Sequence, residues 1–251
     1  MSKTSRDATD KQLLISELTR GAEKVFENAE ALFKEACLLR AIGALSRSLF
    51  LHQISLEECA KLEILGAWAT SLLMGYEVNL TKIKKAMASH ANKNRTNAYF
   101  LKVTADEEAA KQRRDFKGAA EAFSEMQKSF HLKANTAKNA SLYVDFADGK
   151  FVAPNECITP EMVNETASRN EEFLALSFPK LEMLRKWATN PEPICEELVG
   201  FEKRIKELGD QYLDDPEKAL KTLLQEMLER RLEMEKTRQN KNASQDTATK
   251  C

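Results

Sequence analysis

Apolar residues recur at every third or fourth position along most of the chain, which is the spacing that one face of an α-helix requires. The pattern predicts helices over residues 9–39, 44–74, 81–103, 106–140, 159–188, 192–209 and 215–238. Apolar residues cover nearly every side of the second of these helices, as expected for a helix at the centre of a bundle. The pattern therefore predicts an all-α helical bundle built around residues 44–74.

One segment interrupts this pattern, the stretch SLYVDFADGKFVAP at residues 141–154. Its aromatic and β-branched residues favour extended structure, and Asp148-Gly149 is a hairpin-turn dipeptide. We expect a short extended loop or hairpin near residues 142–153. Thr159 and Pro160 then predict a helix start, with Thr159 as the N-cap and Pro160 at the first helical position.

These boundaries predict how the chain is organised. We expect a disordered N-terminus (1–8), a helical core (9–140), an ordered loop or small hairpin (141–158), C-terminal helices packed on the core (159–238) and a disordered tail (239–251). The tail lacks apolar periodicity and so offers nothing to bury.

The charges of the chain nearly balance, with 38 lysines and arginines against 39 aspartates and glutamates. This balance excludes a strong overall field that would recruit nucleic acid or anionic lipid, although a local basic groove stays open. The five cysteines are widely spaced and form no C-x-x-C pair, which indicates reduced thiols in the cytoplasm. Charges interrupt the longest apolar run, and the N-terminus has no apolar signal core. We therefore expect a cytoplasmic protein with no membrane span.

Charged residues share a stripe with large aliphatic residues on the helix predicted over 44–74. The stripe consists of Arg47, Leu51, Ile54, Glu58, Lys61 and Leu65. Glu57 flanks it and precedes Lys61 by four residues, a pairing that favours the helix. Because the opposite side of the helix is also apolar, at least some of these charges are buried or line a cleft. They form either an ion-pair network that fixes helix register or a polar site with tuned pKa values.

The helix predicted over 81–103 places His90 on the same stripe as Ile83 and Met87, and Lys93 stands one turn further along. A lone inward histidine is more often a satisfied core residue than a catalyst. Antiparallel packing of the two helices, however, could bring His90 and Lys93 beside the cluster of Glu57, Glu58 and Lys61. That arrangement offers an imidazole for proton transfer and cations for a phosphate.

The candidate site residues follow from this arrangement. His90, Lys61 and Glu58 are the candidate catalytic residues, and Lys93, Arg47 and Glu57 are the candidate substrate-binding residues. Glu58-x-x-Lys61 resembles a di-iron E-x-x-H motif whose histidine is replaced, and no second such motif occurs. We expect no metal and no other cofactor.

A second histidine pattern, Arg47-x4-His52, matches the R-x4-6-H signature of helical RNA-cleaving domains in spacing alone. Five residues rotate a straight helix by about 140°, so the two side chains are predicted to face different directions. His131 lies on a separate amphipathic helix and is expected to be structural or at the surface.

Four segments together resemble the AbiV family of abortive-infection proteins, which is placed among HEPN-like helical domains. They are ALFKEACLLRAIGALSRSLFLHQISLEECAKLEIL, SHANKNR, SLYVDFADGKFVAP and ITPEMV, and the resemblance covers roughly residues 25–190. The family implies a HEPN-like bundle and a bacterial phage-resistance protein that acts inside the cell. HEPN domains generally dimerise, and the active ones cleave RNA without metal by means of arginine and histidine.

Carried over to this chain, the family's motif positions are Glu57, Glu58, Lys61, His90 and Lys93, and the chain departs from the RNA-cleaving pattern at Arg-x4-6-His. The resemblance implies a homodimer and leaves two functions open. One is a metal-independent endoribonuclease or RNA-binding toxin that blocks translation. The other is a non-enzymatic protein that binds a phage protein or a translation-associated protein, with the polar cluster structural.

Overall fold

The computed structural model describes residues 3–212 together with 215, 218–219, 221–223, 225–226 and 229, with side chains from residue 11 onwards. The elements are α1 (Lys3–Ala41), α2 (Leu45–Leu73), α3 (Leu80–Ala88), α4 (His90–Ala98), α5 (Ala105–Gln112), α6 (Phe116–Ala140), β1 (Asp145–Ala147), β2 (Lys150–Val152), α7 (Pro154–Cys157), α8 (Pro160–Thr189) and α9 (Glu192–Gln211). Apart from one two-stranded hairpin the described elements are helices, so the all-α prediction is confirmed. The chain divides into two compact units between Pro191 and Glu192, and α9 belongs to the second.

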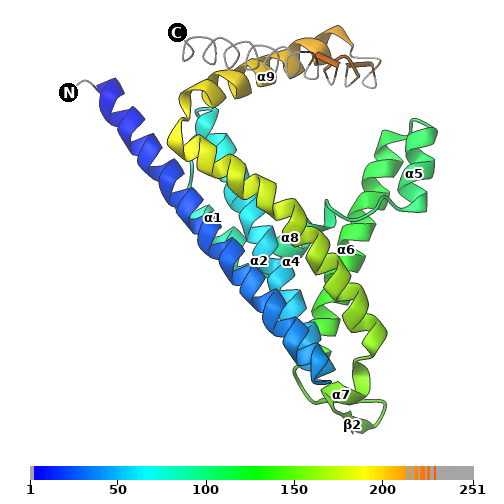
Figure 1. Cartoon of the computed structure of the whole chain (residues 1–251). Helices are drawn as coiled ribbons and strands as arrows, with labels where there is room; N and C mark the ends of the chain where they lie inside the picture. The colour runs from blue at the N-terminus through cyan, green and yellow to red at the C-terminus, as the bar shows by residue number, and fades with distance from the viewer. Residues whose placement is uncertain are drawn as a thin grey trace, which may run out of the picture. The chain divides into compact units, whose positions relative to one another are not determined.

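The core of the first unit lies along α2, which packs against both α1 and α8 (Figure 1). Buried apolar residues of α1 recur at three and four residues, whereas those of α2 occur on several sides of the helix. Leu56 and Cys59 of α2 meet Ala29 of α1 and Phe173 of α8 in one apolar cluster. Each large side chain buried in this way stabilises the fold by about 1.5–3 kcal/mol. The sequence pattern predicted this central position of α2.

The prediction of a single helix over 81–103 is wrong, because the helix is interrupted at Ser89. Ser89 has an extended backbone, with φ −80° and ψ 113°, and it ends α3 and begins α4. Its side-chain oxygen accepts a hydrogen bond from the backbone N–H of Asn92 at 3.2 Å. A serine that caps in this way starts a new helix although the apolar spacing continues across it.

The helix predicted over 106–140 is likewise divided, into α5 and α6. Arg114 takes a left-handed conformation with φ 58°. The Asp115 carboxylate then accepts a hydrogen bond from the Gly118 N–H at 2.8 Å and caps α6. As at Ser89, a capping side chain decides the boundary and the apolar periodicity does not.

The hairpin predicted near 142–153 is confirmed. Strands β1 and β2 are antiparallel, with Phe146 opposite Phe151. Asp148 and Gly149 form the turn with φ values of 50° and 79°, the left-handed pair that a tight hairpin turn requires. Pro160 opens α8 after Thr159, whose hydroxyl accepts a hydrogen bond from the Met162 N–H.

At the ends of the chain, α1 is longer than predicted, since it begins at Lys3 and not at residue 9. The helix predicted over 215–238 lies largely outside the described residues, and the tail predicted over 239–251 lies entirely outside them. None of the helices in the described part of the chain combines the length and apolar character that crossing a membrane would require.

Candidate functional site

Glu57 of α2 is the centre of a buried polar cluster. Its side chain is only 4% exposed. One carboxylate oxygen, Oε2, lies 2.6 Å from Lys93 Nζ and 2.6 Å from His90 Nδ1. The other oxygen, Oε1, accepts a hydrogen bond from Lys138 Nζ at 2.9 Å. We call Glu57, His90, Lys93 and Lys138 the Glu57 cluster.

Helix α4 brings two members of the cluster to Glu57. Because Ser89 caps this helix, His90 occupies its first position and Lys93 follows one turn later. The Asn97 side-chain amide donates a hydrogen bond to the Leu56 carbonyl at 2.8 Å, which fixes α4 on α2. On the α6 side, the Asn94 side chain lies 3.1 Å from His131 Nδ1. The break at Ser89 therefore starts the short helix that carries His90 and Lys93 to Glu57.

The cluster holds Glu57 in its charged form. Burial alone would raise the pKa of the Glu57 carboxyl, but hydrogen bonds from Lys93 and Lys138 and the charges of these lysines outweigh burial and leave the pKa below its usual value. A charged carboxylate can only accept hydrogen bonds, so the 2.6 Å contact requires a proton on His90 Nδ1, and Lys138 Nζ, which lies 3.2 Å from the same nitrogen, donates to Glu57 Oε1. In the neutral ring Nε2 is then the free base, and the His90 side chain is 54% exposed.

The chemistry of the cluster does not suit a metal ion. One carboxylate faces two ammonium groups, and the nearby imidazole donates from Nδ1. Two fixed positive charges oppose a bound cation, and each lysine already occupies an oxygen that a metal would need. Within the described residues no group of three or more histidines, cysteines or acidic side chains is placed to hold a metal ion.

The predicted pairing of Glu57 with Lys61 is wrong, because Lys61 bonds to Glu58. Glu57 is turned instead toward α4 and α6, whose lysines occupy its carboxylate. Glu58 is buried, whereas the side chain of Lys61 is 22% exposed. The two carboxylates at 57 and 58 thus belong to two separate ion-pair groups.

The other candidate residues take different places. Arg47 is exposed and lies eleven residues before Glu58 on the same helix, a distance of roughly 16 Å. The structure therefore brings Glu57, His90 and Lys93 together and leaves Arg47 apart. His90 was expected to point inward, and its Nδ1 does meet a buried carboxylate while about half of its side chain is exposed.

Lys138 is the member of the cluster that sequence reasoning missed. It is buried near the end of α6, 81 residues from Glu57 in sequence. The signal was available, because Lys138 follows Phe130 and Ala134 at intervals of four residues on the apolar stripe of this helix. A lysine that continues an apolar stripe is predicted to face inward, and an inward lysine requires a buried partner.

The comparison with protein families decides the identity of this domain. The HEPN_AbiV family model, described as AbiV, matches residues 17–175. The chain belongs to the AbiV family. The matched region contains every member of the Glu57 cluster, and its helical architecture agrees with a HEPN-like domain.

A curated relative of this AbiV-family chain is the uncharacterized protein y4gJ of Sinorhizobium fredii (strain NBRC 101917 / NGR234). The two are 45% identical over 106 residues, which are 42% of this chain and 55% of that protein. The chain therefore spans about half the length of the curated relative that it matches. No solved structure matches the chain.

The histidine of the Arg47-x4-His52 pattern is a core residue in this AbiV domain. His52 is fully buried, its Nδ1 lies 3.2 Å from the Asn170 side-chain amide, and Phe33 packs edge-on against the ring. Arg47 is exposed, so the two residues form no common site, as the helical geometry predicted. Burial and, to a smaller extent, the charge of Arg40 lower the pKa of His52 to about 4.

We expect His52 to make the stability of the AbiV domain depend on pH between about 6.5 and 4. In this window the unfolded chain binds a proton at residue 52 and the folded chain does not, so stability falls as the pH falls. The full loss is on the order of 3 kcal/mol. Urea unfolding of wild type and His52→Gln at several pH values measures it. In His52→Gln the free energy of unfolding should no longer fall between pH 6.5 and pH 4. If it falls as steeply as in wild type, groups other than His52 cause the pH dependence.

Proposed function

We propose that this protein acts on RNA as a metal-independent abortive-infection endoribonuclease of the bacterial cytoplasm, with His90 as its proton-transfer group. The observation that carries the proposal is the 2.6 Å contact between His90 Nδ1 and Glu57 Oε2 on a half-exposed ring. A carboxylate that accepts from one ring nitrogen fixes the tautomer and directs the basic nitrogen outward. Glu57 is thus a positioning residue, and His90 is the candidate catalytic residue.

The chemistry that fits this geometry is cleavage by the neighbouring ribose hydroxyl. His90 Nε2 removes the proton from a 2′-hydroxyl, and the 2′-oxygen attacks the adjacent phosphorus. The bond from phosphorus to the 5′-oxygen breaks, and that oxygen takes up a proton as it leaves. The products are a 2′,3′-cyclic phosphate and a 5′-hydroxyl, and no step requires a metal or a further cofactor.

The phosphate needs a cation, and Lys61 is the cation of α2 best placed to supply one. It stands one turn after Glu57 on the same helix and is partly exposed, whereas Lys93 and Lys138 are buried against Glu57. On approach of a phosphate, Lys61 would exchange Glu58 for the phosphate oxygens. We further propose a homodimer, as is general among HEPN domains.

Incubation of the purified protein with total bacterial RNA, with and without phage lysate, tests this proposal. We expect new RNA ends that carry 2′,3′-cyclic phosphates, formed equally well in EDTA. The His90→Ala protein, made in the same way, is the matched control. RNA that stays intact under every condition while the protein still protects cells against phage would contradict the proposal.

A second candidate function is a non-enzymatic interaction with a phage protein or a translation-associated protein. The observation that favours it is the saturation of Glu57, whose two oxygens are shared by three nitrogen donors, two of them on buried lysines. A cluster of this kind can be purely structural, with the sole role of holding α2, α4 and α6 in register. This candidate predicts that folded His90→Ala protein still protects against phage.

A further inference from the structure

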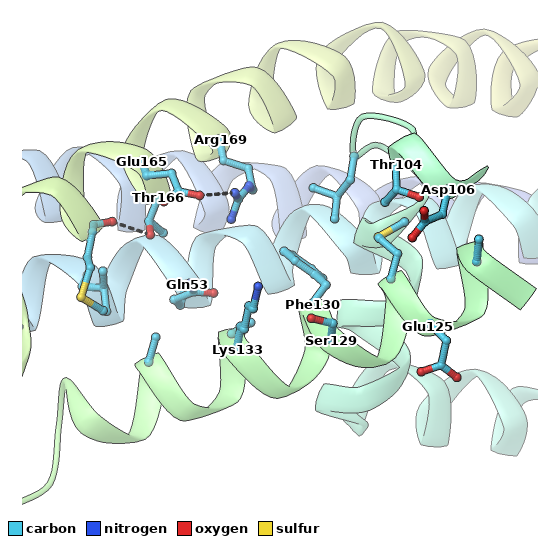
Figure 2. Close-up of a pocket in the computed structure, with 17 residues that line it drawn as sticks. Gln53, Thr104, Asp106, Glu125, Ser129, Phe130, Lys133, Glu165, Thr166 and Arg169 are labelled. Carbon is cyan, nitrogen blue, oxygen red and sulfur yellow. Dashed lines mark hydrogen bonds and ion pairs between the residues drawn. The ribbon is translucent and has the colours of Figure 1, made fainter. Parts of the chain in front are cut away.

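A groove separate from the Glu57 cluster opens between α2, α6 and α8 (Figure 2). Its volume is about 680 Å³, which is within the range of small-ligand and peptide sites. The apolar part of its lining consists mainly of Leu49, Leu101, Met126, Phe130 and Met162. Methionine side chains adapt to different partners, so this lining suits a peptide better than a single rigid ligand. We call it the α6–α8 groove.

Gln53 stands at the floor of this groove with an unused carboxamide. The residue is only 7% exposed and lines the groove, yet it has no hydrogen-bond partner within the described part of the chain. Its carboxamide is not among the fully buried polar atoms and therefore faces the groove, where a ligand can reach it. A ligand that offers a donor and an acceptor side by side would satisfy both ends of the carboxamide.

The two ends of the groove carry charges of opposite sign. Asp106 and Glu125 lie toward one end of the groove, where Glu125 bonds to Lys128, whereas Lys133 and Arg169 lie nearer Gln53, as Figure 2 shows. Arg169 is held over the Phe130 ring at 5.6 Å and bonds to Glu165. Lys133 forms no ion pair with any residue that the structure describes. The basic part therefore has one uncommitted charge next to the unpaired amide.

The distance between the two ends sets the length of a ligand. Glu125 and Lys133 are eight residues apart on α6, or roughly 12 Å. An extended chain covers this distance in about four residues at 3.3 Å each. An extended backbone also presents unpaired N–H and C=O groups, whereas those of a helix are hydrogen-bonded within the helix. A polyanion such as a nucleic acid would be repelled by the acidic end of the groove.

We propose that the α6–α8 groove binds an extended segment of a partner polypeptide. Apolar side chains of the segment pack on the methionines and Phe130, and a backbone amide pairs with the Gln53 carboxamide. A basic side chain meets Asp106 and Glu125, and an acidic side chain about four residues away meets Lys133. The proposal does not depend on whether His90 performs chemistry, because the groove shares no residue with the Glu57 cluster.

Two families of fluorescent peptides test this proposal by anisotropy on the full chain. Both have an apolar three-residue centre of varied sequence; one runs Arg to Glu from N to C, and the other runs Glu to Arg. We expect the protein to prefer one order by about fivefold or more. The double variant Asp106→Lys/Lys133→Glu should reverse this preference, because it exchanges the two lining charges that have no ion-pair partner among the described residues, whereas Glu125 and Arg169 stay paired with Lys128 and Glu165.

Single variants separate the contributions. Gln53→Met keeps the length of the side chain, removes the amide and should weaken both families about tenfold. Lys117→Glu changes an exposed lysine of α6 outside the groove, and His90→Ala changes the Glu57 cluster; both should leave peptide binding unchanged. Absence of peptide binding, or an order preference that the double variant leaves unchanged, overturns the proposal. Binding of a single-stranded RNA oligonucleotide that depends on Gln53 and Lys133 overturns it as well.

Discussion

Replacing Glu57 with alanine should lower the free energy of unfolding by about 3–5 kcal/mol, the usual effect of removing one partner of a buried ion pair. The Lys93 and Lys138 side chains are each less than a tenth exposed, and both bond to this carboxylate. Without it, two buried ammonium groups lie near each other with no counter-charge. Urea unfolding at pH 7, where Glu57 is charged in wild type, measures the loss.

The neighbouring carboxylate supplies a matched control. Glu58 is also buried, but its partner Lys61 is partly exposed and can regain water when the carboxylate is removed. Glu58→Ala should therefore cost less, about 1–2 kcal/mol. If the two variants are equally stable, water solvates Lys93 and Lys138 when the Glu57 carboxylate is removed, which contradicts the prediction.

A triple variant tests the cause of the loss. In Glu57→Leu/Lys93→Met/Lys138→Met the three buried charges of the Glu57 cluster are replaced by apolar groups of similar size. Such replacements are often neutral or stabilising, so the triple variant should recover much of the stability that Glu57→Ala loses. Recovery would show that the unpaired lysines, and not the loss of packing at residue 57, destabilise the single variant.

The fold was largely predictable because burial and helical spacing act locally. An all-round apolar helix such as α2 has to lie at the centre of a bundle, and Asp148-Gly149 supplies the left-handed turn of the hairpin. The breaks at Ser89 and Asp115 were missed for the opposite reason. At both positions the apolar spacing continues and favours one long helix, whereas a single capping side chain favours a break. The apolar spacing alone does not show which of these two influences is stronger.

The candidate site was predictable only in part. The helical wheel identified inward charges on α2 and placed His90 and Lys93 one turn apart, and the structure brings both to α2. It did not identify Glu57 as the centre, because the wheel measures angles within one helix. The partners of Glu57 are set by the positions of α4 and α6, and Lys138 comes from a helix 81 residues away in sequence.

Replacing His90 with alanine should reduce RNA cleavage by about 10²–10⁴-fold, the range that a positioned acid or base contributes. The effect on stability should be small, at most about 1 kcal/mol, because the ring is half exposed and Glu57 keeps both lysines. Cleavage rates of a defined RNA by wild type and His90→Ala, together with their unfolding curves, measure both effects. Loss of cleavage in a fully folded protein shows that His90 contributes to cleavage and not only to stability.

The pH dependence of the residual activity separates catalysis by His90 from a merely structural role. If Nε2 removes the proton of the 2′-hydroxyl, the acid limb of the pH profile of cleavage belongs to His90, and this acid limb disappears in His90→Ala. A structural role would instead leave the acid limb in place and lower the rate equally at every pH. An acid limb that persists in the variant would therefore assign the base to another group, and His90 would be a rim residue that only completes the ion pairing of Glu57.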